Sequence, residues 1–290
     1  MSEERAVYDH VRLLILIVAY EAESTLKDVL DRLPQPVLDS YDVEVLVVDD
    51  ASSDRTYAIG SEYRNAHPEM PLTVLRNEYN QGYGGNQKIG YAYAAANSFD
   101  YVALIHGDGQ YAPEELGRLL QPLVEDGADA VFGSRMMEPR RALRGGMPLY
   151  KYVGNRILTT IQNALTREQL TEYHSGYRVY RVAALEETHY RINTNDFHFD
   201  TQIILQLMNN GATIVELPIP TYYGDEISRV NGLRYAWDVV INTSANFFHR
   251  LGFWQQRRFD ASVRTSSPYR SKLDFTSPHS LAIDAVEPGE

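Results

Sequence analysis

Residues 101–116 read YVALIHGDGQYAPEEL, and this stretch decides the fold. Its apolar run at 101–105 is long enough for a buried strand, and the glycines on either side of Asp108 let the backbone turn directly after it. Pro113 and the two glutamates that follow it are typical of the first turn of a helix. A strand, a glycine turn and a helix in this order indicate the carboxyl edge of an α/β sheet, where such sheets bind ligands.

The turn contains two side-chain oxygens that suit a divalent cation. Asp108 and Gln110 each offer one oxygen, and hard cations such as Mg²⁺ or Mn²⁺, which also hold phosphate oxygens, prefer such ligands. An ordinary turn in which Asp108 only caps the following helix would have the same sequence. From this stretch alone both interpretations stay open.

The composition argues against several classes of function. The formal net charge of −12 argues against a nucleic-acid-binding surface, and the absence of cysteine rules out disulfides and thiolate metal sites. The longest apolar run, at 13–19, is far shorter than the roughly 20 residues that span a bilayer. The charged first residues are unlike a signal peptide. We therefore expect a cytoplasmic protein without a membrane anchor of its own, with peripheral contact to the inner face of a membrane as an option.

The sequence predicts an α/β fold with a mostly parallel, mixed sheet flanked by helices. Strands are expected at 13–19, 43–48, 72–75, 101–105 and 130–132, with helices from about residues 24, 56 and 87 between them. This alternation favours parallel pairing and right-handed crossovers. Within one domain of residues 1–254 we expect a nucleotide-binding half at 11–135 and a second half at 136–254. The second half has predicted helices at 148–165, 199–209 and 227–248, a short strand entered at 174–180 and a strand at 213–217.

Carboxylates recur at the ends of the predicted strands. Glu21 follows the first strand, Asp49 and Asp50 follow the second, and Asp108 follows the fourth. Aspartate is common in turns, but three strand ends with carboxylates on one edge favour a binding crevice. No G-x-G-x-x-G follows the first strand and no P-loop motif occurs. The sequence therefore predicts a nucleotide bound through its base and ribose, with its diphosphate held by a metal on Asp108.

Six segments in this order resemble glycosyltransferase family 2, which has the GT-A fold: LIVAYEAESTL, VLVVDDASSDRT, RNEYNQGYGGNQKIG, IHGDGQYAPEEL, FGSRM and HSGYRVYR. The resemblance covers residues 11–250 and is strongest to the dolichol- and polyprenyl-phosphate hexosyltransferases. It implies a metal-dependent, inverting transfer of a hexose from a UDP- or GDP-linked sugar to a polyprenyl phosphate. A soluble glycan or a small hydroxyl compound is the alternative acceptor.

The same resemblance implies roles for individual residues. It assigns Asp108 to the metal-binding position of the D-x-D motif, with Gln110 assisting, and places Asp49 behind the pocket for the base and ribose. The implied donor-site residues are Ala19, Tyr20, Glu21, Asp50, Asn80, Gly82, His106 and Gly107.

The sequence departs from the family pattern at His106, which occupies the first Asp of D-x-D. A neutral imidazole there would contact the nucleotide or bind a transition metal. Alternatively, His106 only orients Asp108. The missing acid also raises a different hypothesis, a nucleotide-sugar-binding module without catalytic activity.

Arginines of the second half are the expected phosphate contacts, because guanidinium groups match phosphate oxygens bidentately. By the resemblance, Arg135 lies beside the diphosphate, Ser175 and Arg178 lie beside the diphosphate and the acceptor, and Lys151 adds charge. A mobile basic loop on the acceptor side is expected around three further arginines, although these would also suit an ordinary surface: Arg140, Arg141 and Arg144.

The general base is assigned only by resemblance. Asp200 is the better option and Asp196 the second, for an acceptor that is a hydroxyl. A lipid phosphate is already ionised and needs no base, in which case Asp200 is a charge at a helix N-terminus. The segment 222–226 is either an acidic loop closing over the sugar or a turn.

The segment 233–254 combines aromatic residues with arginines. That mixture suits a membrane surface, and packing or a homodimer contact explains it equally well. Packing is the favoured interpretation for Tyr235 and Trp237. The last stretch, SPHSLAIDAVEPGE, resembles the lead-in to a class I methyltransferase domain, so 255–290 is expected to be a linker or tail.

Overall fold

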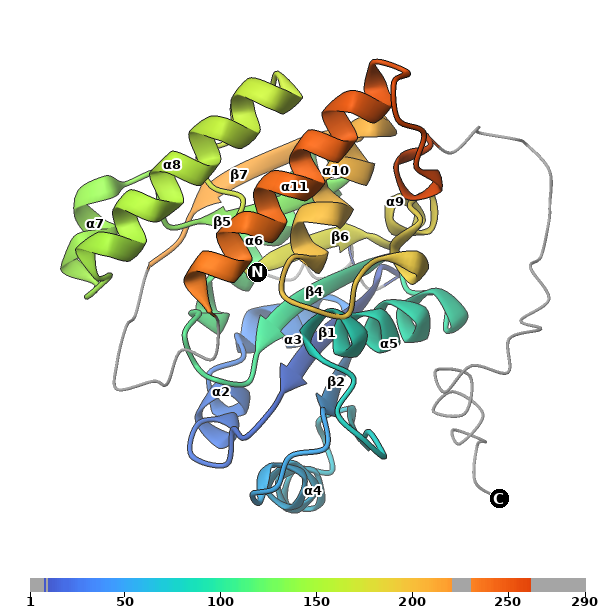
Figure 1. The fold of residues 1–290 in the computed structure, drawn as a ribbon. Helices are drawn as coiled ribbons and strands as arrows, with labels where there is room; N and C mark the ends of the chain where they lie inside the picture. Colours follow the sequence, from blue (N-terminus) through green and yellow to red (C-terminus); the bar gives the residue numbers. More distant parts are fainter. Residues whose placement is uncertain (1–7, 9, 221–230, 262–290) are drawn as a thin grey trace.

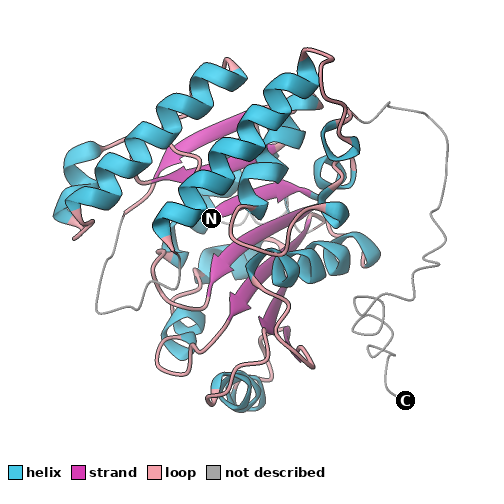
Figure 2. Ribbon diagram, viewed as in Figure 1, coloured by secondary structure: helices cyan, strands magenta, loops and turns pink. Residues whose placement is uncertain are grey.

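The computed structural model describes residues 8, 10–220 and 231–261 (Figure 1). Its centre is a seven-stranded sheet with the order β3-β2-β1-β4-β6-β5-β7. Helices cover both faces of this sheet (Figure 2). The strands are β1 (Arg12–Ala19), β2 (Asp42–Asp49), β3 (Leu72–Arg76), β4 (Tyr101–His106), β5 (Ala130–Ser134), β6 (Arg178–Arg181) and β7 (Ile214–Pro218).

The central strand β1 is apolar throughout because both of its faces are covered. Alternate residues point to opposite sides, so Leu13, Ile15 and Ile17 enter one core cluster. Leu14 and Leu16 enter the other. The first cluster lies under α2 (Leu26–Asp31), α3 (Gln35–Ser40), α4 (Thr56–Ala66) and α6 (Leu116–Val124), and the second under α5 (Tyr83–Ala96), α9 (Val182–Glu186) and α10 (Phe199–Asn209).

Two long helices form a further layer. Helix α8 (Leu149–Thr166) lies beside α11 (Gly232–Arg250), which packs on α10 (Figure 1). Leu205, Ala245 and Phe259 form a small core between α10, α11 and the segment after it. Within the described ranges, no helix is both long and apolar enough to cross a bilayer.

The register confirms that the predicted carboxyl edge exists. Strand β1 is parallel to β2 with Ala19 opposite Asp49. It is also parallel to β4 with Val18 opposite His106. The residues that follow these three strands therefore start from neighbouring points on one edge of the sheet.

The structure confirms the mixed sheet and corrects two local predictions. Strand β6 runs antiparallel to both β4 and β5, so the mostly parallel sheet is mixed, as expected. Helix α5 begins at Tyr83 rather than near residue 87, because the glycines allow its first turn to approach α10 closely; a Cβ on Gly84 would lie 2.6 Å from Phe199 Cβ. The expected mobile loop around Arg140, Arg141 and Arg144 is the short helix α7 (Pro139–Arg144).

Some predictions fall on residues outside the described ranges. These are the acidic loop at 222–226, the start of the helix expected from residue 227, and the linker or tail beyond residue 261. Within the described residues, α11 begins at Gly232, and the side chain of Asn231 caps it by accepting from Arg234 N.

We expect Gly90→Ala to lower the free energy of unfolding by about 1–3 kcal/mol, as overpacking of a tight core does. A Cβ on Gly90 would lie 2.8 Å from Leu16 Cγ and overlap both methyl groups of that leucine. Urea denaturation measures the effect. Gly154→Ala in α8 is the matched control, because nothing lies within 4 Å of its Cβ position. It should stabilise the protein by up to about 1 kcal/mol through helix propensity. Equal effects of the two substitutions would contradict the packing described for α5.

Candidate active site

The loops after β1 and β2 are bound to each other at the carboxyl edge. Glu21 has a φ of 49°, its N–H donates to Ser52 Oγ (2.8 Å), and its carboxylate accepts from Ser53 Oγ (3.0 Å). Ala19 is buried directly before it, whereas the Tyr20 side chain is 40% exposed. Tyr20 and Glu21 thus form one accessible rim of the edge.

The two aspartates after β2 face inward and organise the neighbouring loops. Asp49 is fully buried and accepts from both the N–H and the hydroxyl of Ser52, so it lies behind the rim. Asp50 is 3% exposed and accepts from Asn77 Nδ2 (2.8 Å), Gln81 N (2.7 Å) and Gly82 N (2.9 Å). Burial raises the pKa of Asp50 although these hydrogen bonds oppose the shift. Its carboxylate therefore holds the 77–82 loop in place.

That loop is closed by Asn80 and Gly82. Asn80 donates to the Asp50 carbonyl oxygen (3.1 Å) and accepts from Gly82 N (2.9 Å). Gly82 has a φ of 80°, and a Cβ there would lie 2.6 Å from the carbonyl oxygen of Asn195. Only glycine fits this position, since both its conformation and its contact exclude a side chain.

The turn after β4 presents Asp108 and Gln110 at the same edge. Gly107 N donates to the Val18 carbonyl oxygen (2.9 Å), which fixes the turn against β1. Gly109 has a φ of 75°, and Gln110 N donates to Asp108 Oδ1 (3.0 Å). Both side chains are partly exposed. The sequence placed these residues correctly on the edge, and their proposed role as metal ligands stays a prediction.

His106 begins a chain of buried polar groups. The Tyr83 hydroxyl lies 3.2 Å from His106 Nε2 and donates to Asp200 Oδ2 (2.9 Å). Asp200 Oδ1 accepts from Gln87 Nε2 (3.2 Å) and lies 3.4 Å from a guanidinium nitrogen of Arg178. Four secondary-structure elements contribute residues to this group of polar side chains: β4, α5, α10 and β6.

The hydrogen bonds from His106 through Tyr83 to Asp200 fix the tautomer of His106. A tyrosine has one hydroxyl proton, and Tyr83 gives it to Asp200, so its oxygen accepts from His106 Nε2–H. Nδ1 is then the unprotonated nitrogen. Burial lowers the pKa of His106, so the imidazole is neutral near pH 7.

The HSGYR segment packs directly on this imidazole. A Cβ on Gly176 would lie 2.5 Å from His106 Nε2 and 3.1 Å from the Tyr83 hydroxyl. Gly176 N donates to the Tyr111 hydroxyl (2.7 Å), and the Tyr111 ring meets His106 edge-on at 5.1 Å. The glycine therefore makes room for a histidine at the end of β4.

Arg178 and Asp200 are both buried and lie against each other, and Asp200 is at the start of α10 as expected. Arg178 is 1% exposed, donates to the carbonyl oxygens of Ser175 (2.8 Å) and Tyr173 (2.9 Å), and lies over the Phe132 ring. Asp200 is 5% exposed. Each group is enclosed and paired with the other. A phosphate contact by Arg178 and a general base at Asp200 stay predictions.

Arg135 is held by a buried carboxylate. Its backbone N–H and its Nε donate to Glu172 (2.7 and 3.0 Å), and its side chain is 11% exposed. Burial opposes ionisation of Glu172, but the charge and hydrogen bonds of Arg135 outweigh it and hold the pKa of Glu172 below its usual value. Asn155 of α8 also donates to Glu172 (2.7 Å). Ser175 is 2% exposed in the same segment.

Sequence reasoning missed Tyr83, Tyr111, Gly176 and Glu172. The tyrosines and the glycine lie inside the motifs already noted, but their partners are distant in the chain; Tyr83 and Asp200 are 117 residues apart. Nothing in the local pattern reveals such pairs.

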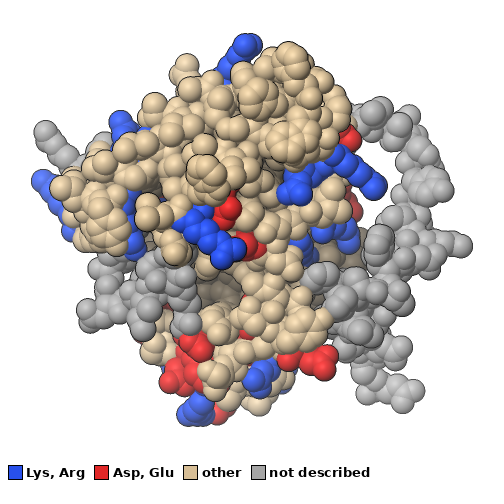
Figure 3. All heavy atoms as spheres, in the orientation of Figure 1, with Lys and Arg blue, Asp and Glu red and all other residues tan. Residues whose placement is uncertain are grey.

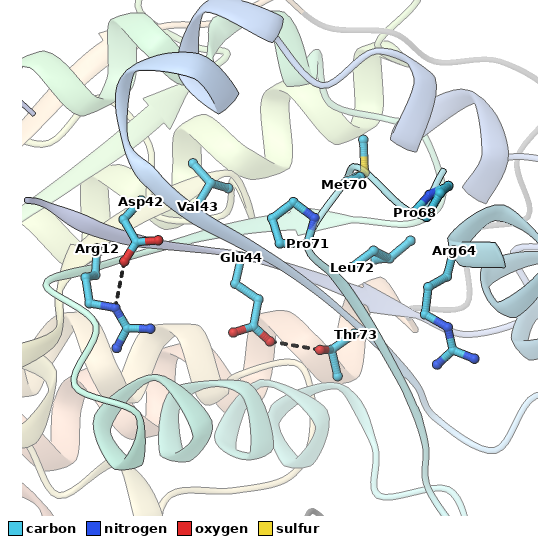
Figure 4. Close-up of a pocket in the computed structure, with 10 residues that line it drawn as sticks. All are labelled: Arg12, Asp42, Val43, Glu44, Arg64, Pro68, Met70, Pro71, Leu72 and Thr73. Carbon is cyan, nitrogen blue, oxygen red and sulfur yellow. Dashed lines mark hydrogen bonds and ion pairs between the residues drawn. The ribbon is translucent and has the colours of Figure 1, made fainter. Parts of the chain in front are cut away.

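Two other features of the described residues involve different side chains. Asp196, His198 and Asp238 have possible ligand atoms within 4.8 Å of one another. Arg234 already lies 3.7 and 3.9 Å from the two carboxylates. An open groove of about 530 Å³ lies at the amino ends of β1, β2 and β3 and is lined by residues that include Arg12, Asp42 and Glu44 (Figure 4). It contains none of the predicted site residues.

Comparisons with known proteins agree on one family. The sequence profile described as Glycosyl transferase family 2 matches residues 14–188. The UDP-N-acetylglucosamine–dolichyl-phosphate N-acetylglucosaminyltransferase of Methanococcus voltae is 28% identical over 221 residues, which is 73% of this chain and 86% of that protein. The polyprenol monophosphomannose synthase of Mycolicibacterium smegmatis is 30% identical over 213 residues, which is 72% of this chain and 76% of that protein.

A solved structure shares the fold. Glucosyl-3-phosphoglycerate synthase from Mycobacterium tuberculosis, in complex with Mg²⁺ and UDP, superposes with a TM-score of 0.59 at 18% identity. The superposition covers 86% of this chain and 83% of that one.

We expect Gly176→Ala to destabilise the protein by about 1–3 kcal/mol, because the new methyl group overlaps the His106 ring. His106→Ala removes that ring, so the double variant should recover much of the loss caused by Gly176→Ala. Urea denaturation of the single and double variants gives the coupling energy. Gly117→Ala, whose Cβ would be in ordinary contact at 3.4 Å, serves as control. Strictly additive effects of the pair would show that the two residues do not press on each other.

The tautomer of His106 is directly measurable. Long-range ¹H–¹⁵N spectra of the wild-type protein should show a proton on Nε2 and none on Nδ1, and the ring should stay neutral below the usual pKa of 6.5. Tyr83→Phe removes the acceptor, so both tautomers should appear, with a loss of about 1–3 kcal/mol from the unpaired buried groups. Tyr57→Phe, on the exposed side of α4, should change neither property. A wild-type signal from protonated Nδ1 would disprove the hydrogen-bonded chain.

Proposed function

Because this chain belongs to glycosyltransferase family 2 and has the GT-A fold, we propose that it moves a hexose from a nucleoside-diphosphate sugar to a polyprenyl phosphate. The transfer inverts the anomeric carbon in one displacement, and Mg²⁺ or Mn²⁺ assists it. The observation that carries this proposal is the shared edge at which Glu21, Asp50 and Asp108 follow three adjacent parallel strands.

The donor nucleotide binds at the rim formed by the first two loops. Tyr20 offers an exposed ring and Glu21 a carboxylate that suits ribose hydroxyls. Asp50, Asn80 and Gly82 support this pocket by shaping the 77–82 loop. The Methanococcus relative is named for a UDP-linked sugar, and the structural neighbour was crystallised with UDP, so UDP-linked donors are the first to test.

Asp108 and Gln110 fit a divalent cation by their chemistry. Both offer oxygen, and both are partly exposed on a turn whose backbone is fixed. A cation bound there would neutralise charge on the leaving diphosphate. His106 adds an unprotonated nitrogen to the turn without adding negative charge, and Gly107 lets the turn lie against Ala19.

A phosphate acceptor agrees with the state of Asp200. A hydroxyl acceptor needs a base to remove its proton, and Asp200 is enclosed between Arg178, Tyr83 and Gln87. A lipid phosphate is ionised near neutral pH and needs no such group. The names of both relatives include a lipid or polyprenol phosphate product or acceptor, which supports the same class.

Side chains of the second half contact the acceptor phosphate in this proposal. Arg135 and Ser175 lie near the end of β5 and the HSGYR segment, and Lys151 is on the first turn of α8. In this proposal the catalytic domain spans residues 1–254, and the protein acts in the cytoplasm at the inner face of the membrane that holds its acceptor.

The proposal is tested by a panel of nucleotide sugars with a short-chain polyprenyl phosphate, Mn²⁺ and mass spectrometry of the product. One donor should give a glycosyl phosphodiester. The same assay with hydroxyl acceptors should give none. Transfer to a hydroxyl acceptor and none to the phosphate would overturn the proposed acceptor class.

Asp108→Asn should lower turnover by about 100-fold to 1000-fold, as removal of a group that stabilises developing charge does. It should also abolish the extra thermal stabilisation that Mn²⁺ gives in the presence of the nucleotide, because ligand stabilisation follows affinity for the folded state. Asp126→Asn, an exposed carboxylate between α6 and β5, is the control and should behave as wild type. An Asp108→Asn variant with wild-type metal dependence would remove Asp108 from the site.

A further inference from the structure

Helix α8 has its polarity reversed relative to an ordinary surface helix. Its buried residues are all polar: Asn155, Thr159, Gln162 and Thr166. Its exposed residues include four large apolar ones: Leu149 (67% exposed), Tyr150 (74%), Val153 (45%) and Ile157 (55%). A helix on a water-facing surface turns its apolar stripe to the core. The outer side of α8 therefore suits an apolar environment.

Helix α11 continues this surface. Leu233 (87% exposed), Trp237 (67%) and Ile241 (44%) follow one another at intervals of four residues, which puts them on one side of the helix. Phe248 (46%) lies near its end, and the turn after it exposes Leu251, Phe253 and Trp254. We call these residues and the outer residues of α8 the α8–α11 face. In Figure 3 the surface over these helices is mostly tan, which marks residues that are neither acidic nor basic.

The exposure of Trp237 corrects the packing interpretation given for it from the sequence. Tyr235 does pack as expected, with its hydroxyl 2.9 Å from His174 Nδ1. Trp237, two residues later, points away from that contact and is two-thirds exposed. Apolar patches of this extent on a monomer mark an interaction surface.

The charge around the face is strongly basic in an acidic protein. Residues 139–167 contain six lysines and arginines and no acidic residue, and residues 231–259 contain four arginines and only Asp238. The whole chain has a formal net charge of −12, so its acidic residues are concentrated elsewhere. Among the basic residues, Arg144, Arg156, Arg250 and Arg257 are exposed.

We propose that the α8–α11 face docks on the surface of an anionic lipid bilayer. Tryptophan, tyrosine and phenylalanine insert at the level of the headgroups, and surrounding arginines attract anionic lipids. Charge complementarity decides between two partners for this face, a second copy of the chain and a membrane. A second copy of the chain would set this basic face against itself, which like-charge repulsion disfavours, whereas an anionic membrane complements it.

The face is connected to the site. Asn155, on the inner side of α8, donates to Glu172, which holds Arg135 (2.7 and 3.0 Å). Docking would thus place α8 between the bilayer and the arginine proposed to meet the acceptor. Membrane docking goes beyond the proposed reaction, and vesicle binding requires neither donor nor acceptor.

The two tryptophans of the chain, Trp237 and Trp254, both belong to this face, so their fluorescence reports on it alone. The full chain should float with vesicles of phosphatidylcholine and phosphatidylglycerol. Its emission should shift to the blue and be quenched by brominated lipid. Binding should be about tenfold or more weaker to pure phosphatidylcholine and should weaken as salt is raised.

The variant Val153→Gln/Ile157→Gln removes apolar area but leaves both tryptophans in place, and should bind anionic vesicles about tenfold or more weakly. Ile192→Gln/Tyr57→Gln is the matched control, because these two residues are similarly exposed but lie on other elements. Circular dichroism confirms that both variants fold. Each should retain transfer to a short-chain acceptor in detergent, so loss of docking is distinguishable from failure of the proposed reaction.

Three results would overturn the proposal. These are absence of vesicle binding by the wild-type chain, equal binding by Val153→Gln/Ile157→Gln, and a blue shift that depends on protein concentration without lipid. The last result would identify the face as a contact between two copies of the chain.

Discussion

The site depends on the contacts of the buried Asp200 carboxylate with Arg178 and Tyr83. This carboxylate joins α10 to β6 through the ion pair and to α5 through the tyrosine, and Tyr83 extends the connection to His106 at the end of β4. Losing one partner of a buried ion pair typically costs about 3–5 kcal/mol, because the other charge stays unpaired. The turn that carries Asp108 is therefore positioned by contacts from both halves of the chain.

This constraint explains how a histidine occupies a position where the family pattern has an aspartate. The imidazole is larger than a carboxylate, and Gly176 provides the space for it. It is also neutral, and Tyr83 satisfies its Nε2–H while Asp200 satisfies Tyr83. The turn consequently has one carboxylate, Asp108, where a D-x-D motif would have two. A cation bound there, as proposed, would rely more on the diphosphate for its negative ligands.

The sequence was sufficient for the strands and for the edge that they share, because fully buried parallel strands appear as uninterrupted apolar runs. It was insufficient where a residue's role depends on a distant partner. Arg178 matches a phosphate-binding motif, yet its partner Asp200 encloses it. Helix α5 starts a turn early because its glycines meet α10. Trp237 has the residue type of a packed core position, and only the three-dimensional arrangement shows that it faces outward.

The position of the divalent cation is the most direct test of this account. Crystals grown with Mn²⁺ and the nucleoside diphosphate should give an anomalous peak within coordination distance of the Asp108 carboxylate, with the diphosphate beside it and the His106–Tyr83 hydrogen bond intact. A peak at Asp196, His198 and Asp238 instead, with the diphosphate away from the turn after β4, would contradict it.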